Sequence, residues 1–307
     1  MLFESKPWNP TCRLFDSLII SKTNLDKVLY PSGFTKAQVI DYMARISPVA
    51  IPHLTGRALT FRRYPDGSAT DGFFEKRCPD HRPPWLDVAL GPGDRRGGIE
   101  YCRIDEPAAM VWAANMAALE LHAPMALATA LDVPRAVVFD FDPGAPAGIV
   151  ECCQIALATR NVLSAVGLEG WCKTSGSKGL QMYVPLNTPD ARHDAAADFA
   201  LAMGQVLERQ MRGRVTTVMA KSEREGKVFV DWSQNAFHKT TIAPYSLRAR
   251  DEPTVSTPVT WDEVEESAAD GSALRFTSDE VLERVDRLGD LFAPVLTVEQ
   301  SLPVPGA

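Results

Sequence analysis

One short segment restricts the fold and the chemistry of this chain more than any other. Residues 137–144 read Val-Val-Phe-Asp-Phe-Asp-Pro-Gly, an apolar strand ended by a Pro-Gly turn. Residues two apart on a strand share a face, so Asp140 and Asp142 project together while the two phenylalanines face a buried side. Two such carboxylates repel each other unless a cation lies between them, and oxygen-ligated divalent cations are the usual partners. The alternative is a solvated strand end before a turn.

A third carboxylate has a similar setting. Asp231 lies in the apolar segment 228–232, where it alternates with valines and a tryptophan and so faces away from their buried side. Taken alone, this residue could equally be an aspartate at an exposed strand edge. The polar, basic and aromatic run at 234–250 follows it, and this composition suits contacts with phosphates and sugars better than a core.

Between these carboxylates lies the segment 174–180, Thr-Ser-Gly-Ser-Lys-Gly-Leu. Small residues and glycines let backbone N–H groups approach an anion, and Lys178 adds a positive charge. The spacing of a Walker A loop is absent. A tight hairpin turn without a ligand is the alternative interpretation.

Periodicity and turn residues predict the remaining elements. Helices are expected at 35–47, 107–121, 148–166, 193–211, 261–269 and 278–291, and strands at 135–141, 170–174, 180–186 and 228–232. Because helices and strands do not alternate strictly, the expected fold class is α+β. Nothing marks a domain boundary, so residues 1–307 are interpreted as one domain with an acidic helical tail, 267–307, packed on the core.

Charge and cysteine content narrow the class of protein. The net charge is −7, but residues 251–307 hold 13 of the acidic groups against 3 basic ones, which leaves the body with 29 basic and 26 acidic groups. A mildly basic body permits DNA binding. The sequence has no long apolar run, so we expect no membrane contact. The N-terminus lacks a secretory pattern and the cysteines form no paired motif, so we expect reduced cysteines without structural zinc. The expected location is the cytoplasm, in association with the nucleoid. The spacing Cys78-x-x-His81 is too little for a metal site.

The motifs above, taken in order, resemble those of the ligase D polymerase family of the archaeo-eukaryotic primase superfamily. The N-terminal third agrees at 26–31 (Asp-Lys-Val-Leu-Tyr-Pro), 62–67 (Arg-Arg-Tyr-Pro-Asp-Gly), 73–76 (Phe-Phe-Glu-Lys) and 120–124 (Glu-Leu-His-Ala-Pro). The resemblance runs from about residue 24 to 266. It implies a primase-type catalytic core of mixed sheets flanked by helices, and a DNA-dependent nucleotidyltransferase that extends primers.

The same resemblance assigns roles to individual residues. Asp140, Asp142 and Asp231 would hold two Mn²⁺ or Mg²⁺ ions, which activate the primer 3′-hydroxyl and stabilise charge on the triphosphate. The residues that match nucleotide-binding positions are His122, Ser175, Lys178, Gln181, Arg224, Gln234, Ser246 and Arg248. Those that match positions for DNA or a downstream 5′-phosphate are Lys27, Lys36, Arg62, Arg63, Phe73, Phe74 and Lys76. Adjacent residues on an extended segment cannot both face one core, which favours a stacking role for the two phenylalanines.

Two departures from the family pattern affect what we expect. Gln181 stands where the family more often has a histidine, so nucleotide affinity or metal preference is expected to differ. The segment 123–134 is shorter and less polar than in the ligase-fused modules, and this disfavours the joining of broken ends. We therefore expect short-gap filling with NTPs or dNTPs, ribonucleotides being used at least as readily, and a ligase supplied as a separate protein.

Other functions remain open at this point. End joining and primer synthesis are alternatives within the same family. Outside it, a haloacid-dehalogenase-like phosphatase also begins with an apolar strand and Asp-x-Asp, but it requires Thr or Val where Gly144 stands. A DNA-binding module without catalysis would not need three strand-borne carboxylates, because they repel phosphate unless a metal is bound.

Overall fold

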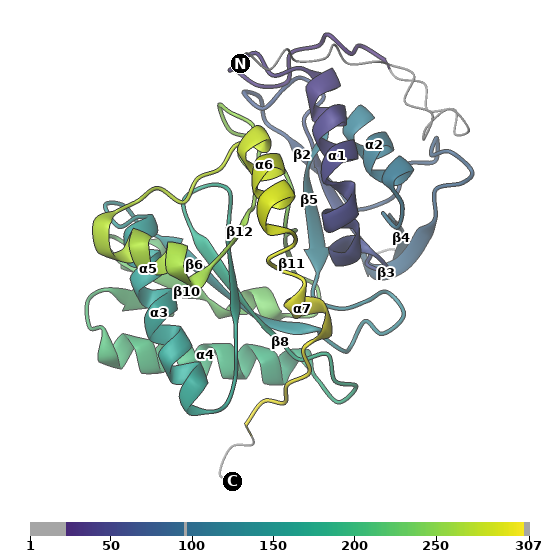
Figure 1. Cartoon of the computed structure of the whole chain (residues 1–307). Helices are drawn as coiled ribbons and strands as arrows, with labels where there is room; N and C mark the ends of the chain where they lie inside the picture. Colours follow the sequence, from purple (N-terminus) through teal and green to yellow (C-terminus); the bar gives the residue numbers. More distant parts are fainter. Residues whose placement is uncertain (1–22, 95–96, 304–307) are drawn as a thin grey trace.

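The computed structural model describes residues 23–94 and 97–303. Within these residues the strands form a four-stranded sheet in the order β11-β5-β1-β2, a six-stranded sheet in the order β12-β7-β8-β6-β10-β9, and a separate hairpin of β3 and β4. Figure 1 shows the two larger sheets side by side, each with helices on its outer face. The expected α+β fold is confirmed. Cys12, the N-terminal segment judged not to be secretory, and the last residues of the tail lie outside the described residues.

The four-stranded sheet is antiparallel throughout. Its strands are β11 (Thr240–Ile242), β5 (Ala118–Pro124), β1 (Thr60–Arg63) and β2 (Phe73–Glu75), and the hairpin strands are β3 (Val88–Asp94) and β4 (Gly97–Cys102). Helices α1 (Lys36–Leu54) and α2 (Pro107–Asn115) cover one face, where Met43, Phe61 and Leu121 share one buried cluster. The other face of this sheet is left for polar residues.

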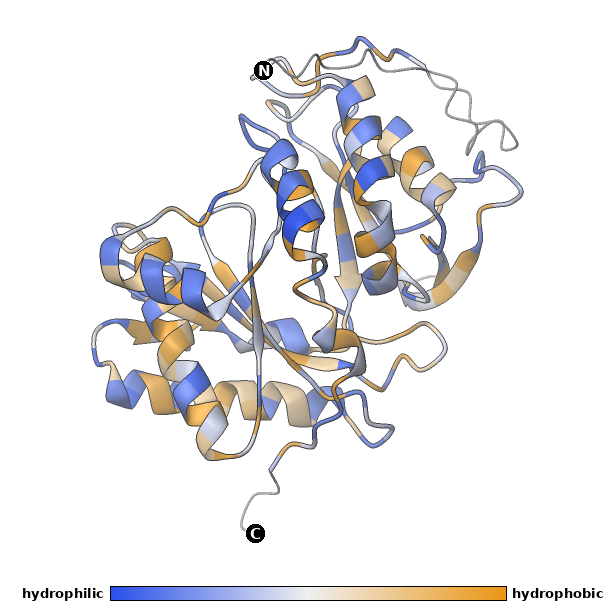
Figure 2. Ribbon diagram, viewed as in Figure 1, coloured by the Kyte–Doolittle hydropathy of each residue, from blue (hydrophilic) through white to orange (hydrophobic). Residues whose placement is uncertain are grey.

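The six-stranded sheet is antiparallel except where β9 runs parallel to β10. Its strands are β12 (Pro258–Val259), β7 (Trp171–Thr174), β8 (Leu180–Pro185), β6 (Ala136–Pro143), β10 (Val228–Asp231) and β9 (Val215–Thr216). Helices α3 (Ile149–Ala165) and α4 (His193–Gln210) bury their apolar faces against it, together with Phe139 and Phe141, which are fully buried as the alternation predicts. Figure 2 shows the complementary hydrophilic faces of these helices turned outward.

The acidic tail forms two helices and a final turn. Helix α5 (Trp261–Asp270) packs on α3, α6 (Ser278–Leu288) packs on α1, and α7 (Pro294–Thr297) lies beside β8. Gly271, at φ +80°, ends α5 in the left-handed conformation that glycine adopts without strain. No helix of the described chain is long and apolar enough to cross a membrane.

Two helix predictions were wrong in extent. The expected helix 107–121 ends at Asn115, because Ala117 takes a positive φ of 54° and the chain then enters strand β5, paired on both sides. Local composition favours a helix there, but the sheet overrides it. The expected helix 35–47 continues to Leu54 past Pro48. Pro48 cannot donate to the carbonyl of Ala44, which instead accepts from the Ser47 hydroxyl at 2.8 Å.

The expectation of fully reduced cysteines was also wrong. Cys78 and Cys102 form a disulfide that ties the segment after β2 to β4. The two residues have different sequence neighbourhoods and come together only through the sheet. With its sulfur in this bond, Cys78 is unable to ligate zinc beside His81. Cys152, Cys153 and Cys172 are buried thiols in the core.

Candidate active site

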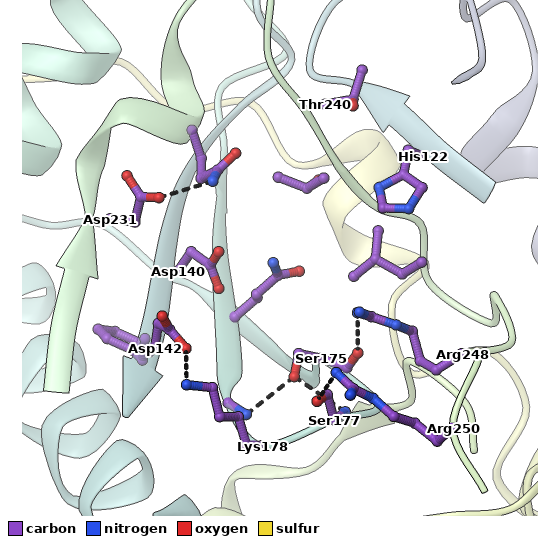
Figure 3. Close-up of a pocket in the computed structure, with 16 residues that line it drawn as sticks. His122, Asp140, Asp142, Ser175, Ser177, Lys178, Asp231, Thr240, Arg248 and Arg250 are labelled. Carbon is purple, nitrogen blue, oxygen red and sulfur yellow. Dashed lines mark hydrogen bonds and ion pairs between the residues drawn. The ribbon is translucent and has the colours of Figure 1, made fainter. Parts of the chain in front are cut away.

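A cavity of about 330 Å³ lies between the two large sheets. Figure 3 shows its side chains converging from both sides. Of the predicted residues, those that line it are His122, Asp140, Asp142, Ser175, Lys178, Gln181, Asp231, Gln234 and Arg248. The structure therefore brings together the three carboxylates and most of the predicted nucleotide-binding residues, although they come from positions spread over more than a hundred residues of sequence.

Strand pairing explains how the carboxylates meet. Asp231 on β10 lies directly opposite Asp140 on β6, and Asp142 follows two residues later on the same face. Directly opposed residues of an antiparallel pair have Cβ atoms about 5 Å apart. Burial raises the pKa of Asp140 to about 6 from its ordinary 3.8; the Asp231 and Asp142 charges add to the rise, while a hydrogen bond from Gln181 and the Lys173 charge oppose it. An acidic cluster in this state favours a cation.

Each of the other two carboxylates has protein partners. Asp142 Oδ1 lies 2.9 Å from Lys178 Nζ, and Asp142 Oδ2 lies 3.6 Å from Arg224 Nη1. Asp231 accepts from the Ser233 hydroxyl at 2.6 Å and from Gln234 Nε2 at 2.9 Å. Among residues 23–94 and 97–303, no three acidic, histidine or cysteine side chains already surround one point.

The donor set nevertheless fits hard divalent cations. All three groups are carboxylates, the ligand type that Mg²⁺ and Mn²⁺ prefer, and all three lie on the neighbouring strands β6 and β10. One partner of Asp142, Lys178, is 61% exposed and can re-orient when a cation binds. Asp140, Asp142 and Asp231 are therefore the residues that would hold the metal.

A buried lysine fixes the polar floor beside Asp140. Lys173 is fully buried, and its Nζ donates to Gln181 Oε1 at 2.6 Å and to Ser256 Oγ at 2.7 Å. A lysine only donates, so the Gln181 oxygen must face it and the Gln181 amide hydrogens face Asp140. Burial lowers the pKa of Lys173 well below its ordinary value. Gln181, predicted to bind the nucleotide, thus contacts Asp140 in this structure.

The loop between β7 and β8 differs from its predicted anion cradle. The Gly179 N–H donates to the Ser175 hydroxyl at 3.1 Å, and the Ser175 N–H donates to the Gly179 carbonyl at 2.9 Å. The Ser177 N–H also turns to the Ser175 hydroxyl, at 3.3 Å. Most of the loop's N–H groups are therefore used internally, and an anion would be held mainly by side chains such as that of Lys178.

The opposite wall is built around one buried carboxylate. Glu120 is 1% exposed; its Oε1 lies 3.0 Å from Arg248 Nε, and its Oε2 lies 3.0 Å from His122 Nε2 and 3.7 Å from Arg62 Nη1. Burial alone would raise the pKa of Glu120, but the His122 hydrogen bond and the Arg248 charge lower it to about 2. Burial lowers the pKa of His122. Glu120 thus positions the cations that face the cavity.

Two predicted nucleotide-binding residues do not line the cavity. Ser246 is 1% exposed, and its hydroxyl accepts from the Leu121 N–H at 2.8 Å, so it braces β5 from behind. Arg224 lies at the margin, where its guanidinium stacks 3.7 Å above the Phe229 ring and reaches toward Asp142. Both residues act on the cavity through neighbours.

The predicted DNA-binding residues lie at the end of the four-stranded sheet. Phe73 and Phe74 are 46% and 57% exposed, with Arg63 and Arg62 stacked on their rings at 5.4 and 5.2 Å. Exposed aromatic faces suit base stacking. Lys76, in the next turn, is exposed.

Lys27 and Lys36 lie close together with Arg63. Burial lowers the pKa of Lys36, and the charges of Lys27 and Arg63 lower it further. The first N–H groups of helix α1 are not available to an anion here: the Lys36 N–H donates to the Lys27 carbonyl at 2.8 Å, and the next N–H donates to the Leu25 carbonyl at 2.9 Å. A phosphate here would be bound by side-chain charge.

Sequence reasoning missed three residues that shape the site. Glu120 opens the motif at 120–124, and Lys173 directly precedes the segment 174–180. Neither was assigned a role, because the importance of each depends on its burial in the folded protein. Arg250, which lines the cavity and donates to the Ser177 hydroxyl at 2.5 Å, lay within a run noted only for its charge. The signal available was the alternation in 120–122, which puts Glu120 and His122 on one strand face.

Comparison with known proteins identifies the family. The sequence model of the family described as "LigD, primase-polymerase domain" matches residues 35–292. The chain belongs to the LigD primase-polymerase domain family. It is a metal-dependent nucleotidyltransferase of the primase-polymerase class, and the phosphatase and non-catalytic alternatives were wrong. The match extends beyond residue 266, where the resemblance was expected to end, and includes α6.

Individual relatives agree with this assignment. The chain is 45% identical over 276 residues to the multifunctional non-homologous end joining protein LigD of Mycolicibacterium smegmatis, covering 89% of this chain but 35% of that protein. It is 30% identical to the bifunctional non-homologous end joining protein LigD of Bacillus subtilis, covering 93% of this chain and 44% of that protein. The chain thus spans about a third to under half of these relatives.

A solved structure is similar over nearly its whole length. The polymerase domain from Mycobacterium tuberculosis ligase D, in complex with DNA, superimposes with a TM-score of 0.83 at 41% identity, covering 90% of this chain and 98% of that one. This likeness confirms the fold.

Proposed function

We propose that this protein extends primers on a DNA template with two divalent cations, Mn²⁺ or Mg²⁺, and that it fills short gaps during DNA repair. The observation that carries the proposal is the cavity itself: three carboxylates on β6 and β10 face a wall of cations and polar groups. Negative charge on one side suits the metals, and positive charge on the other suits a triphosphate.

The chemistry follows from this division. Bound cations would lower the pKa of the primer 3′-hydroxyl and neutralise charge on the triphosphate. Lys178 and Arg248 reach the same cavity from separate segments and would hold the phosphates in line with the carboxylates. Arg248 is fixed by Glu120 at 3.0 Å and by the Ser175 carbonyl at 2.8 Å, so its guanidinium is positioned before the nucleotide arrives.

Sugar preference depends on Gln234. Gln234 lines the cavity and its Nε2 donates to Asp231 at 2.9 Å, so the remaining acceptor of this side chain is its amide oxygen, which could accept from a ribose 2′-hydroxyl. One such bond contributes about 0.5–1.5 kcal/mol. We expect ribonucleotides to be incorporated at least as readily as deoxyribonucleotides, and Gln234→Leu to shift the ratio toward the deoxy form. A strong deoxy preference of the wild type in single-turnover assays would contradict this.

Gap recognition rests on the cluster of Lys27, Lys36 and Arg63. A terminal 5′-phosphate carries more charge than an internal one and is the better match for closely spaced cations. We expect tighter binding to a gap with a downstream 5′-phosphate than to the same gap with a 5′-hydroxyl. Lys27 is 41% exposed, and its one ion pair within residues 23–94 and 97–303 is with exposed Asp66 at 3.2 Å, so Lys27→Ala should remove most of the difference without unfolding the protein.

The matched control is Arg287→Ala, which removes an exposed cation from α6. Its preference for the 5′-phosphate should equal that of the wild type, and both gaps should bind more weakly at higher salt. Equal wild-type affinity for the two gaps at one salt concentration would show that the lysines are ordinary surface charges.

End joining is the second candidate, favoured by the names of the relatives. The expectation of gap filling rests on the short segment 123–134, and the two activities separate in one assay that compares a gapped duplex, two overhanging ends and a bare single strand. Greatest extension on the gap supports gap filling. We further propose that sealing falls to a ligase, whether on this or another chain, and that the protein acts at the nucleoid in the cytoplasm.

A further inference from the structure

A second cavity adjoins the active site on the far side of the loop between β7 and β8. It measures about 460 Å³ and shares Ser177, Lys178 and Arg250 with the nucleotide cavity. Figure 3 shows Lys178 and Arg250 at this edge of the site. The two cavities are therefore neighbours separated only by the loop and by side chains that reach both.

The second cavity is positively charged. Lys178, Arg250 and Arg275 line it, with Asp251 as the acidic residue of the lining. Arg250 is exposed and has no ion pair with any carboxylate in the described part of the chain; a 2.5 Å hydrogen bond to the Ser177 hydroxyl holds it at the shared rim. Arg275 pairs with Glu252 at 3.2 Å, but both side chains are half-exposed, so this pair is weak and readily exchanged for an anion.

The wall between the cavities is rigid. A side chain on Gly176, at φ +66°, would approach the carbonyl carbon of Val255 to 2.7 Å, so the loop packs directly on that segment. The Gly176 carbonyl also accepts from the Thr254 hydroxyl at 2.7 Å. A preformed cationic cavity of this kind loses little conformational entropy when it binds an anion.

Nucleotidyl transfer in the adjoining nucleotide cavity would produce a suitable anion, pyrophosphate. In nucleotidyl transfer the primer 3′-oxygen forms a bond to the α-phosphorus, the α–β anhydride bond breaks, and its electron pair leaves with pyrophosphate, while the hydroxyl proton passes to solvent. Lys178 and Arg250 are cations on one side of the nucleotide cavity, so the β- and γ-phosphates of a bound nucleotide would lie on that side. Any path from there through the shared rim leads into the second cavity.

We propose that this second cavity is a polyphosphate site that receives pyrophosphate after each nucleotide addition, with Arg275 as its outer ligand. The inference rests on the proposed polymerase function. It assigns Arg275, which lies between the two tail helices and outside the nucleotide cavity, a part in product release. Lys178 and Arg250 would contact the anion throughout its passage from one cavity to the other, because both residues line the two cavities.

The test is inhibition of primer extension by added pyrophosphate. Arg275→Ala should raise the inhibition constant for pyrophosphate roughly tenfold, the effect of losing one charge-assisted contact, with the nucleotide KM and single-turnover rate unchanged. Glu252→Gln frees Arg275 from its partner and should lower the same constant. Arg287→Ala, the matched loss of one exposed cation, should leave it unchanged.

The results distinguish failure of the pyrophosphate site from failure of the proposed polymerase function. An unchanged inhibition constant in Arg275→Ala, or an equal change in Arg287→Ala, overturns the site while leaving the polymerase function intact. If Arg275→Ala instead impairs only the joining of two free nucleotides without a primer, the cavity holds the triphosphate of an initiating nucleotide and the pyrophosphate assignment is overturned. Absence of any wild-type extension would contradict the proposed function itself.

Discussion

Asp140 and Glu120 are carboxylic acids on opposite walls of one cavity, yet their surroundings move their pKa values in opposite directions. Burial and two neighbouring aspartates raise the pKa of Asp140 to about 6. Glu120 is also buried, but the His122 hydrogen bond and the Arg248 charge lower its pKa to about 2. Asp140 has no ion pair among the described residues, whereas Glu120 pairs with Arg248 at 3.0 Å.

The two walls also differ in how the chain builds them. The carboxylates occupy two neighbouring strands, in a register that follows from ordinary sheet pairing. The cationic wall joins Arg62, Glu120 and Arg248, and its central ion pair spans 128 residues of sequence. We propose that the carboxylate wall binds metals because its three negative charges lie close together, whereas the other wall is preorganised because buried Glu120 holds Arg62 and Arg248 in place. Substitutions on the carboxylate wall should therefore reduce nucleotide addition, whereas substitutions on the other wall should reduce stability and nucleotide affinity.

The largest effect is expected on the carboxylate wall. Asp140→Asn or Asp142→Asn should reduce single-turnover nucleotide addition at least about a thousandfold, since metal stabilisation is worth several kcal/mol. The thermal midpoint should stay level or rise, because a mutually repelling charge is removed. Circular dichroism melting beside the kinetic assay checks both halves. Near-normal addition by Asp142→Asn would mean that this wall does not hold the metals.

Glu120→Gln should instead impair stability and nucleotide affinity together. Removing the buried carboxylate leaves Arg248 and Arg62 without their counter-charge. This should lower the free energy of unfolding by about 3 kcal/mol. The nucleotide KM should rise more than kcat falls, because Arg248 loses its position. Denaturant unfolding measures the first effect and steady-state extension the second. A stable variant with an unaltered KM would show that Arg248 needs no buried counter-charge.

The same carboxylate predicts a pH dependence of stability. Because folding lowers the pKa of Glu120 from its ordinary 4.5 to about 2, its stabilisation is complete above pH 4.5 and declines as the pH falls toward 2. Across that interval the wild-type free energy of unfolding should fall more steeply than that of Glu120→Gln. Parallel curves would contradict the shift.

A smaller effect is expected from the tail. Asp290 accepts from the Tyr245 hydroxyl at 2.6 Å and lies 2.8 Å from His53 Nε2, so it ties helix α1 to the segment that carries Arg248. Tyr245 has a positive φ of 65°, a strained conformation for a residue with a side chain. Asp290→Asn should lower stability by about 1–2 kcal/mol and raise the nucleotide KM modestly. An altered stability with an unchanged KM would limit the tail to a structural role.

The contrast between the walls also explains what the sequence could predict. Period-two alternation alone places Asp140 and Asp142 on one face, and the buried phenylalanines confirm it. Glu120 lies in a segment whose composition favours a helix, and only pairing with β1 and β11 makes it a strand. Lys173 reads as an ordinary surface charge until tertiary packing buries it. The Cys78–Cys102 bond likewise joins segments that only the fold brings together.

The most direct test of the two-wall account is the number of Mn²⁺ ions bound with a non-hydrolysable nucleotide analogue, counted by electron paramagnetic resonance titration. The wild type should bind two ions per chain. The Asp140→Asn, Asp142→Asn double variant should bind none tightly while still folding, and Glu120→Gln should retain both once the analogue is saturating. Two tightly bound ions in the double variant would contradict the account.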